Sequence, residues 1–308
     1  LEAVLARYGR APLEAGIDAL LDHGARTTAR ALARLPEGEW TATDWLDGDG
    51  LTEDPIRMQA TVSHRAGRFV VDFAGSAPAA RGPVNLPYGS TVATAKVAFK
   101  ALTSPFEPTN AGHMRALEVR AEPGTLFHAV YPAPTFTQWT GTVALELIFK
   151  ALAQAVPDRI QASSGGDVPG FMMIGRHPDT GAPFAVSNNE SVGWGATASH
   201  DGKLAGSHLA QSIVRNTPVE VLEAKTAMRV ERLELRPGSF GEGRWRGGPG
   251  VRRDLVFTAP GEFLTIAKKT RSRPWALAGG GEPAVWKAEL LSAAGAHVEV
   301  LADDRVTG

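Results

Sequence analysis

The chain has 308 residues, 43% of them hydrophobic, which is enough for a sizeable core in one or two domains. Its 32 Lys and Arg residues balance 33 Asp and Glu residues, and a formal net charge of −1 argues against a general nucleic-acid-binding protein. The absence of cysteine excludes disulfides, a thiolate nucleophile and a Cys-based zinc site. No apolar run approaches the roughly 20 residues that span a bilayer, and no signal peptide opens the chain, so we expect a cytoplasmic protein without membrane contact.

The 34 glycines and 21 prolines indicate many turns. They favour a loop-rich α+β fold with largely antiparallel strands and a few amphipathic helices. No repeat, linker or composition change marks a boundary, so we expect one domain over residues 1–308. The sequence starts without Met and inside a helical pattern, which predicts that it is a piece of a longer polypeptide.

A helical pattern runs through residues 1–35, interrupted at Gly9–Pro12. Small residues at Gly24 and Thr28 fall on the same face as the apolar ones, so the period of 3.6 residues is kept. The apolar positions are Leu13, Ile17, Leu20, Leu21, Ala31, Leu32 and Leu35. This pattern predicts a helix whose apolar stripe is buried along its length.

Alternating apolar residues predict a strand near Trp40–Trp45 and two strands, Met58–His64 and Arg68–Phe73, joined around Ala66-Gly67. Apolar stripes predict further helices at 91–103 and 141–155. Later strands are expected at 255–257, 263–267, 287–291 and 298–301.

An acidic turn follows the first strand and contains Asp47, Asp49 and Asp54. It faintly resembles a calcium loop. The spacing lacks the closing Glu and the flanking helices of an EF-hand, so a plain turn is favoured.

The richest source of chemistry is the stretch Asn188–Glu223, which has polar side chains and no long apolar run. Its candidate groups are Asn188, Asn189, Glu190, His200, Asp201, His208, Asn216, Glu220 and Glu223. Loops of this kind often carry binding and catalytic groups. Two roles are open for these side chains. They could fix the loops by hydrogen bonds to the backbone, or they could orient and polarise an amide-like substrate.

Other site types have weaker support. His200, Asp201 and His208 could offer ligands to a divalent metal, but their spacing is not that of a helix-borne pair and Asp201-Gly202 reads as a turn. The glycine-rich run 238–250 lacks the P-loop ending and reads as a series of turns that need positive φ. No G-x-S-x-G elbow supports a serine hydrolase. A basic cluster that includes Arg252 and Arg253 reads as solvated surface or as a subunit contact.

Several motifs occur together in a fixed order. They are DFAGSAPAARGPVN (72–85), PTNAG (108–112), PGT (123–125), QWTGTVAL (138–145), NNESVGWGATASHDGK (188–203), NTPVEVLE (216–223), GEGRWRGGPGVRR (241–253) and TRSRPWALAGG (270–280). This set resembles the hydantoinase B/5-oxoprolinase family over essentially the whole chain.

The resemblance implies ATP-dependent opening of a cyclic amide such as a hydantoin or 5-oxoproline, with a separate A-type subunit or domain that binds ATP. ATP would phosphorylate the amide oxygen, and the B-type chain would bind the ring and stabilise the charge that develops on it. Relatives in the same superfamily carboxylate ketones, so a carboxylase subunit is an alternative, and a truncated, non-catalytic scaffold is a second one.

Within this resemblance, the expected catalytic residues are Asn189, Glu190, His200 and Asp201, and the expected substrate-binding residues are Asn216, Glu220 and Arg252. Family members continue upstream through a His/Asp-containing segment and end in a glycine-rich tail. Because this sequence shows neither, we expect a central to C-terminal portion of the family domain, with most ligands of any divalent metal outside it.

Overall fold

The computed structural model describes residues 1–136, 139–211, 213–267, 269, 271 and 274–277. The strands expected at 287–291 and 298–301 lie outside this part of the chain. The chain divides into two compact units, Leu1–Gln161 (unit 1) and Ala162–Gly308 (unit 2). Their sheets are mostly antiparallel and are combined with helices, which confirms the α+β prediction. None of the helices in the described residues is both long and apolar enough to cross a membrane.

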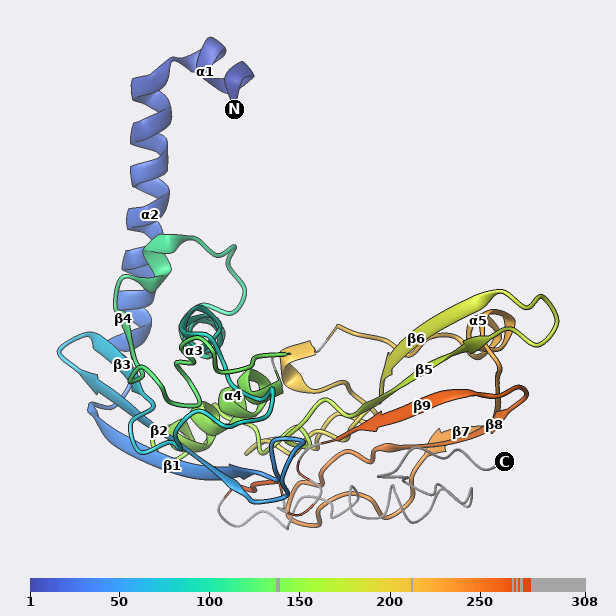
Figure 1. Ribbon diagram of the computed structural model, residues 1–308. Coiled ribbons are helices and arrows are strands. Elements are labelled where there is room, and N and C mark those ends of the chain that lie inside the picture. Colours follow the sequence, from blue (N-terminus) through green and yellow to red (C-terminus); the bar gives the residue numbers. More distant parts are fainter. Residues whose placement is uncertain (137–138, 212, 268, 270, 272–273, 278–308) are drawn as a thin grey trace. The chain divides into compact units, whose positions relative to one another are not determined.

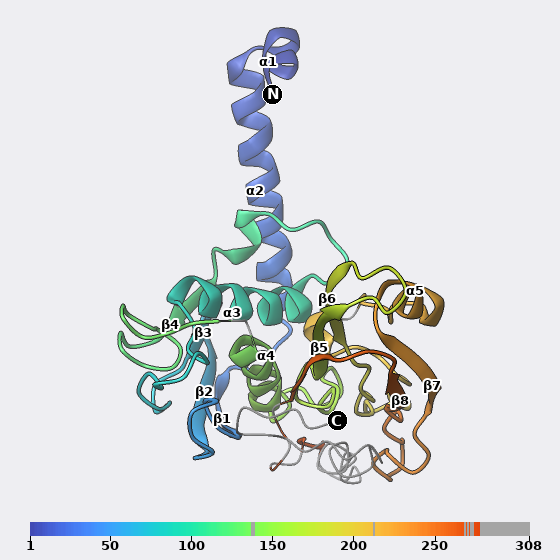
Figure 2. The same ribbon diagram turned by 45° about the vertical axis from the view of Figure 1, so that its right-hand side comes forward.

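Unit 1 is built on a four-stranded sheet with the order β1-β2-β3-β4, in which only the β3–β4 pair is parallel. Its elements are α1 (Glu2–Tyr8), α2 (Arg10–Leu32), β1 (Gly38–Leu46), β2 (Ile56–Arg65), β3 (Arg68–Asp72), α3 (Tyr88–Thr103), the 3₁₀ helix η1 (Ala111–Met114), β4 (Leu117–Arg120) and α4 (Trp139–Leu152). Helix α4 packs on β1 and β2, and α3 packs beside α4 (Figures 1 and 2).

The predicted hairpin of β2 and β3 is confirmed. Ala66 and Gly67 have φ values of 50° and 73°, the left-handed conformation that a two-residue hairpin turn requires. Phe69, Val71 and Phe73 alternate along the chain and are at most 2% exposed, so one face of the hairpin is core. The predicted helices at 91–103 and 141–155 correspond to α3 and α4. The end of α3 is as predicted, and the other three boundaries are shifted by two or three residues.

Helix α2 is present as predicted, but its apolar stripe is buried only toward its C-terminal end. Gly24, Thr28 and Leu32 are buried, whereas Ile17 is 46% exposed and Leu20 is 63% exposed. Figure 1 shows the reason, because the first turns of α2 extend beyond the rest of unit 1. The expectation of a stripe buried along its whole length was therefore wrong: periodicity indicates an apolar face, but it does not supply a partner for that face.

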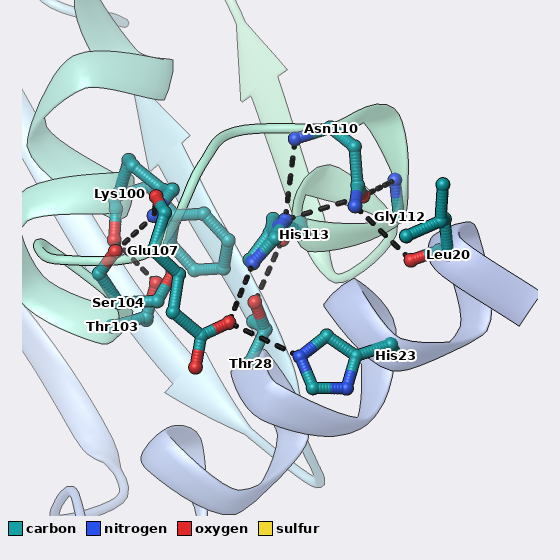
Figure 3. A network of polar contacts seen from close by, with 11 residues as sticks. Leu20, His23, Thr28, Lys100, Thr103, Ser104, Glu107, Asn110, Gly112 and His113 are labelled. Carbon is teal, nitrogen blue, oxygen red and sulfur yellow. Dashed lines mark hydrogen bonds and ion pairs between the residues drawn. The ribbon is translucent and has the colours of Figure 1, made fainter.

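The C-terminal half of α2 is fixed to unit 1 by the PTNAG motif and η1 (Figure 3). Asn110 caps η1 by accepting a hydrogen bond from the backbone N–H of Gly112 at 2.9 Å, and its Nδ2 donates to the carbonyl of Leu20 at 3.0 Å. The hydroxyl of Thr28 donates to the carbonyl of His113 at 3.0 Å. The motif and η1 thus contact two successive regions of the helix.

Glu107 adds a charged contact to this junction. Its Oε2 lies 3.4 Å from Nε2 of His23 on α2 and 3.5 Å from Nε2 of the buried His113 on η1 (Figure 3). Desolvation acts to raise the pKa of Glu107, but its hydrogen bonds to the two imidazoles and their charges outweigh this effect and lower the pKa. The carboxylate therefore stays ionised between the two rings.

The acidic turn after β1 is held by Asp49. Its Oδ1 accepts hydrogen bonds from the backbone N–H groups of Leu51 and Thr52, each at 2.9 Å, and its Oδ2 accepts one from Gly82 at 2.8 Å. Burial acts to raise the pKa of Asp49, but these N–H groups outweigh it and lower the pKa. The carboxylate is used to fix the turn, as favoured from the sequence.

Replacing Asp49 by Ala is expected to lower the free energy of unfolding by about 2–3 kcal/mol at pH 7, because three backbone N–H groups lose a charged acceptor. Urea unfolding measures the loss. Because the pKa of Asp49 is depressed in the folded state, its contribution to the free energy of unfolding is present above the unfolded value of 3.8 and decreases as the pH falls through the folded pKa. Asp54→Ala, at an exposed position in the same turn, is the matched control and should change stability by less than about 0.5 kcal/mol.

Unit 2 contains a three-stranded antiparallel sheet with the order β6-β5-β9 and an antiparallel pair, β7 and β8. Its elements are β5 (Gly170–Arg176), β6 (Pro183–Asn189), the 3₁₀ helix η2 (Leu209–Gln211), α5 (Val219–Lys225), β7 (Met228–Leu235), β8 (Val251–Phe257) and β9 (Gly261–Ile266). Its core joins Phe171 and Met173 of β5 to Leu222 of α5 and Met228 of β7. Leu255 of β8 packs against this core.

Candidate functional site

The polar stretch identified in the sequence begins at the end of β6. Asn188 and Asn189 are paired with Phe171 and Gly170 of β5, and the backbone N–H of Glu190 donates to the carbonyl of Pro169 at 2.7 Å. A Cβ atom on Gly170 would lie 2.4 Å from the carbonyl oxygen of Asn188, so the strand pair needs glycine there. The sheet therefore fixes the backbone of the NNE motif.

Hydrogen bonds connect this motif to two later segments. The buried Asn188 donates through Nδ2 to Oε1 of Glu190 at 3.1 Å, and its Oδ1 accepts from the hydroxyl of Thr217 at 3.2 Å. Asn189 donates to Oε1 of Gln211 at 2.6 Å. We call the assembled group the polar cluster; it consists of Asn188, Asn189, Glu190, Ser191, Gln211, Asn216, Thr217 and Arg253.

The centre of the polar cluster is an ion pair between Glu190 and Arg253 of β8. The Nε of Arg253 lies 3.0 Å from Oε1 and 3.3 Å from Oε2 of Glu190. The side chains are 4% exposed for Arg253 and 13% exposed for Glu190. Burial raises the pKa of Glu190, although the charge of Arg253 and the amide of Asn188 oppose this effect.

Arg253 has donor capacity that the described part of the chain does not use. Its Nη1 and Nη2 atoms are buried, and neither has a hydrogen-bond partner among the described residues. A guanidinium is always charged and presents its N–H groups in a rigid plane. The polar cluster can therefore offer N–H donors to an oxygen atom of a ligand.

The arginine that the sequence indicated as a substrate-binding residue was the neighbouring Arg252. Arg252 is exposed and forms two hydrogen bonds of 3.0 Å with Asp254, so the expected solvated surface describes Arg252 but not Arg253. Successive strand residues point to opposite faces. Arg253 precedes Leu255, which packs against the core, by two positions, and this alternation was the signal that could have identified it.

Of the other expected site residues, the structure brings Asn189, Glu190 and Asn216 into the polar cluster. His200 and Asp201 lie in an exposed turn, where Nδ1 of His200 is 2.8 Å from the carbonyl of Asp201 and Oδ1 of Asp201 accepts from the backbone N–H of Arg246 at 2.7 Å. Glu220 is exposed in the first turn of α5. The roles of all these residues in binding or catalysis stay predictions.

The sequence offered His200, Asp201 and His208 as possible ligands of a divalent metal ion. His208 is fully buried, and its Nδ1 accepts a hydrogen bond from the backbone N–H of Ala210 at 3.2 Å. In the part of the chain that the structure describes, no group of three or more His, Asp or Glu side chains is arranged to hold a metal ion.

The glycine-rich run 238–250 needs glycine for a different reason from the one expected. All of its residues are described, and Gly238, with φ of 69°, is the one that has a positive φ. A Cβ on Gly248 would lie 2.0 Å from the carbonyl oxygen of Lys203, and a Cβ on Gly193 would lie 1.6 Å from that of Gly248. The expectation of positive φ at several positions was therefore wrong. The glycines at these contacts allow loops to approach closely.

Comparisons with known proteins agree with the motif set. The family described as Hydantoinase B/oxoprolinase matches residues 1–307. The chain is 29% identical to a protein of Pseudomonas sp. (strain NS671) that is named as the B component of a D-/L-hydantoinase. That match extends over 285 residues, which cover 88% of this chain and 47% of the relative.

Two solved structures are similar. The ATP-dependent caprolactamase from Pseudomonas jessenii has a TM-score of 0.73 at 27% identity, over 83% of this chain and 45% of the other. A nucleotide-free acetone carboxylase has a TM-score of 0.76 at 19% identity, over 86% of this chain and 38% of the other, which shows a shared fold. The chain thus spans less than half the length of each of these proteins.

Proposed function

The chain belongs to the hydantoinase B/oxoprolinase family, and from this premise we propose that it acts as a B-type component of an ATP-dependent enzyme that opens cyclic amides. The substrate class is a hydantoin or a lactam such as 5-oxoproline. ATP is held by a separate A-type subunit. A divalent metal ion, where one is used, takes most of its ligands from outside this chain.

The observation that carries this proposal is the position of the buried Glu190–Arg253 pair. The polar cluster around this pair brings together three of the family-like motifs, NNES at 188–191, NTPVE at 216–220 and the end of the GVRR motif at 250–253. Motifs that are distant in sequence therefore form one polar cluster. Its amide and guanidinium groups can bind the polar atoms of a small ring.

The chemistry requires that the amide carbon become more electrophilic. The amide oxygen attacks the γ-phosphorus of ATP as the bond to ADP breaks, and water then adds to the amide carbon. The C–N bond breaks, its electron pair goes to nitrogen, which takes a proton, and a second water releases phosphate from the acyl group. One lactam, one ATP and two waters give the amino acid, ADP and phosphate, whereas a hydantoin gives the N-carbamoyl amino acid instead. Donors near the oxygen stabilise the developing charge.

Within the proposal, Asn189, Glu190 and Asn216 contact the ring or its activated form. His200, Asp201, Glu220 and Arg252 are retained as proposed site residues on exposed segments. In this proposal, an A-type partner that covers these exposed groups completes the site around them. This arrangement is consistent with a two-component enzyme.

The test combines the full chain with an A-type partner and follows ATP turnover and ring opening on hydantoin and 5-oxoproline. We expect partner-dependent hydrolysis of at least one ring. Glu190→Gln should lower kcat/KM by about 100-fold, because it changes the centre of the polar cluster. The matched control is Glu231→Gln, which makes the same change at an exposed position of β7 and should leave the rate unchanged.

Other outcomes would remove the proposal. Absence of partner-dependent hydrolysis of any lactam or hydantoin would exclude the hydrolase. Bicarbonate-dependent consumption of acetone would identify a carboxylase. Formation of a complex without either reaction would indicate a non-catalytic scaffold.

A further inference from the structure

The guanidinium of Arg253 uses only part of its hydrogen-bonding capacity within the described residues. Glu190 occupies its Nε, at 3.0 Å and 3.3 Å from the two carboxylate oxygens. Its Nη1 and Nη2 are buried without a partner among the described residues. A buried donor without an acceptor is costly, and most such groups in proteins are satisfied. The terminal edge of this guanidinium therefore presents N–H groups that acceptor oxygens of a bound molecule can satisfy.

The charge of the pair restricts what that molecule can be. Arg253 carries one positive charge, and Glu190, when ionised, carries the compensating negative charge 3.0 Å away. The site is then neutral. A carboxylate ligand would meet the repulsion of Glu190, whereas a carbonyl oxygen accepts the same N–H groups without adding a charge. The pair therefore favours neutral ligands.

We infer that Nη1 and Nη2 of Arg253 bind the carbonyl oxygen of a neutral cyclic amide, and that Glu190 makes this site select neutral ligands over carboxylates. The identity of the ligand rests on the proposed function, but the binding does not require turnover. During ring opening the carbonyl oxygen gains negative charge, so the same N–H groups bind it more strongly than in the substrate.

Direct binding to the full chain tests this inference. Ligand-observed NMR titrations use 2-pyrrolidinone as the neutral probe and acetate as the anionic probe at pH 7.5. The wild-type chain should bind 2-pyrrolidinone at least tenfold more tightly than acetate. Arg253→Lys keeps the charge but loses the guanidinium fork, so it should weaken the binding of 2-pyrrolidinone at least tenfold. Arg229→Lys, which makes the same change at an exposed position of β7, should leave both affinities unchanged.

Glu190→Gln is the second variant and is independent of any folding defect in Arg253→Lys. It keeps a side-chain oxygen near Nε but removes the compensating charge, so acetate should bind at least tenfold more tightly than to the wild type. Equal binding of 2-pyrrolidinone to wild type and Arg253→Lys would overturn the inference. No binding of 2-pyrrolidinone to the wild type, or no change in acetate binding in Glu190→Gln, would also overturn it.

The two proposals can fail separately. Ring opening with the partner, together with 2-pyrrolidinone binding that does not depend on Arg253, would overturn the role of Arg253 alone. The expected binding pattern without ring opening of any substrate would overturn the proposed function alone.

Discussion

Replacement of Arg253 by Met is expected to lower the free energy of unfolding by about 3–5 kcal/mol at pH 8, the usual cost when one member of a buried ion pair is removed. Without the guanidinium, Glu190 must stay ionised in a buried position or take up a proton. Burial already raises the folded pKa of Glu190, so the folded state favours its protonated form. The contribution of Glu190 to the free energy of unfolding is therefore fully present below the ordinary pKa of 4.5 and is lost as the pH rises through the folded pKa. The variant should raise that pKa further, so the loss should be smaller at pH 5 than at pH 8.

Urea unfolding at both pH values measures the effect. The double variant Arg253→Met/Glu190→Gln removes the charge as well and should recover most of the stability at pH 8. Arg252→Met removes an exposed ion pair and should cost less than about 1 kcal/mol. A loss for Arg253→Met that is equally large at both pH values would show that packing, rather than the charge of Glu190, dominates.

Replacement of Gly112 by Ala is expected to destabilise unit 1 by about 3 kcal/mol. A Cβ at this position would lie 1.8 Å from the carbonyl oxygen of Leu21 and 2.6 Å from its carbonyl carbon. These are backbone atoms of α2, so the helix and η1 must move apart. That movement strains the Asn110–Leu20 and Thr28–His113 hydrogen bonds (Figure 3).

Two measurements on the full chain test this expectation. They are the thermal unfolding of unit 1 and the rate of protease cleavage after the basic residues of α2. Gly16→Ala is the control because it lies in the same helix and a Cβ there has no neighbour within 4 Å. It should raise stability by about 0.5–1 kcal/mol through helix propensity. Equal effects of the two substitutions would contradict the close packing of η1 on α2.

The local structure of this protein could be predicted because its signals are short in range. The turn at Ala66-Gly67 follows from two adjacent residues, and the buried face of β3 follows from the alternation of Phe69, Val71 and Phe73. The stripes of α3 and α4 follow from the helical period in the same way. Exposure of Ile17 and Leu20 could not be predicted like this, because burial depends on what packs against the helix.

The candidate site shows the same division. The sequence by itself determined the family-like motifs and identified Asn189, Glu190 and Asn216 as residues of interest. Only the tertiary structure decided that Arg253, 63 positions after Glu190, contacts that carboxylate, whereas His200 and Asp201 lie in an exposed turn. The physical reason is that local patterns fix the face of a strand or helix, while the packing of β6 and β8 on a common core fixes which distant side chains meet.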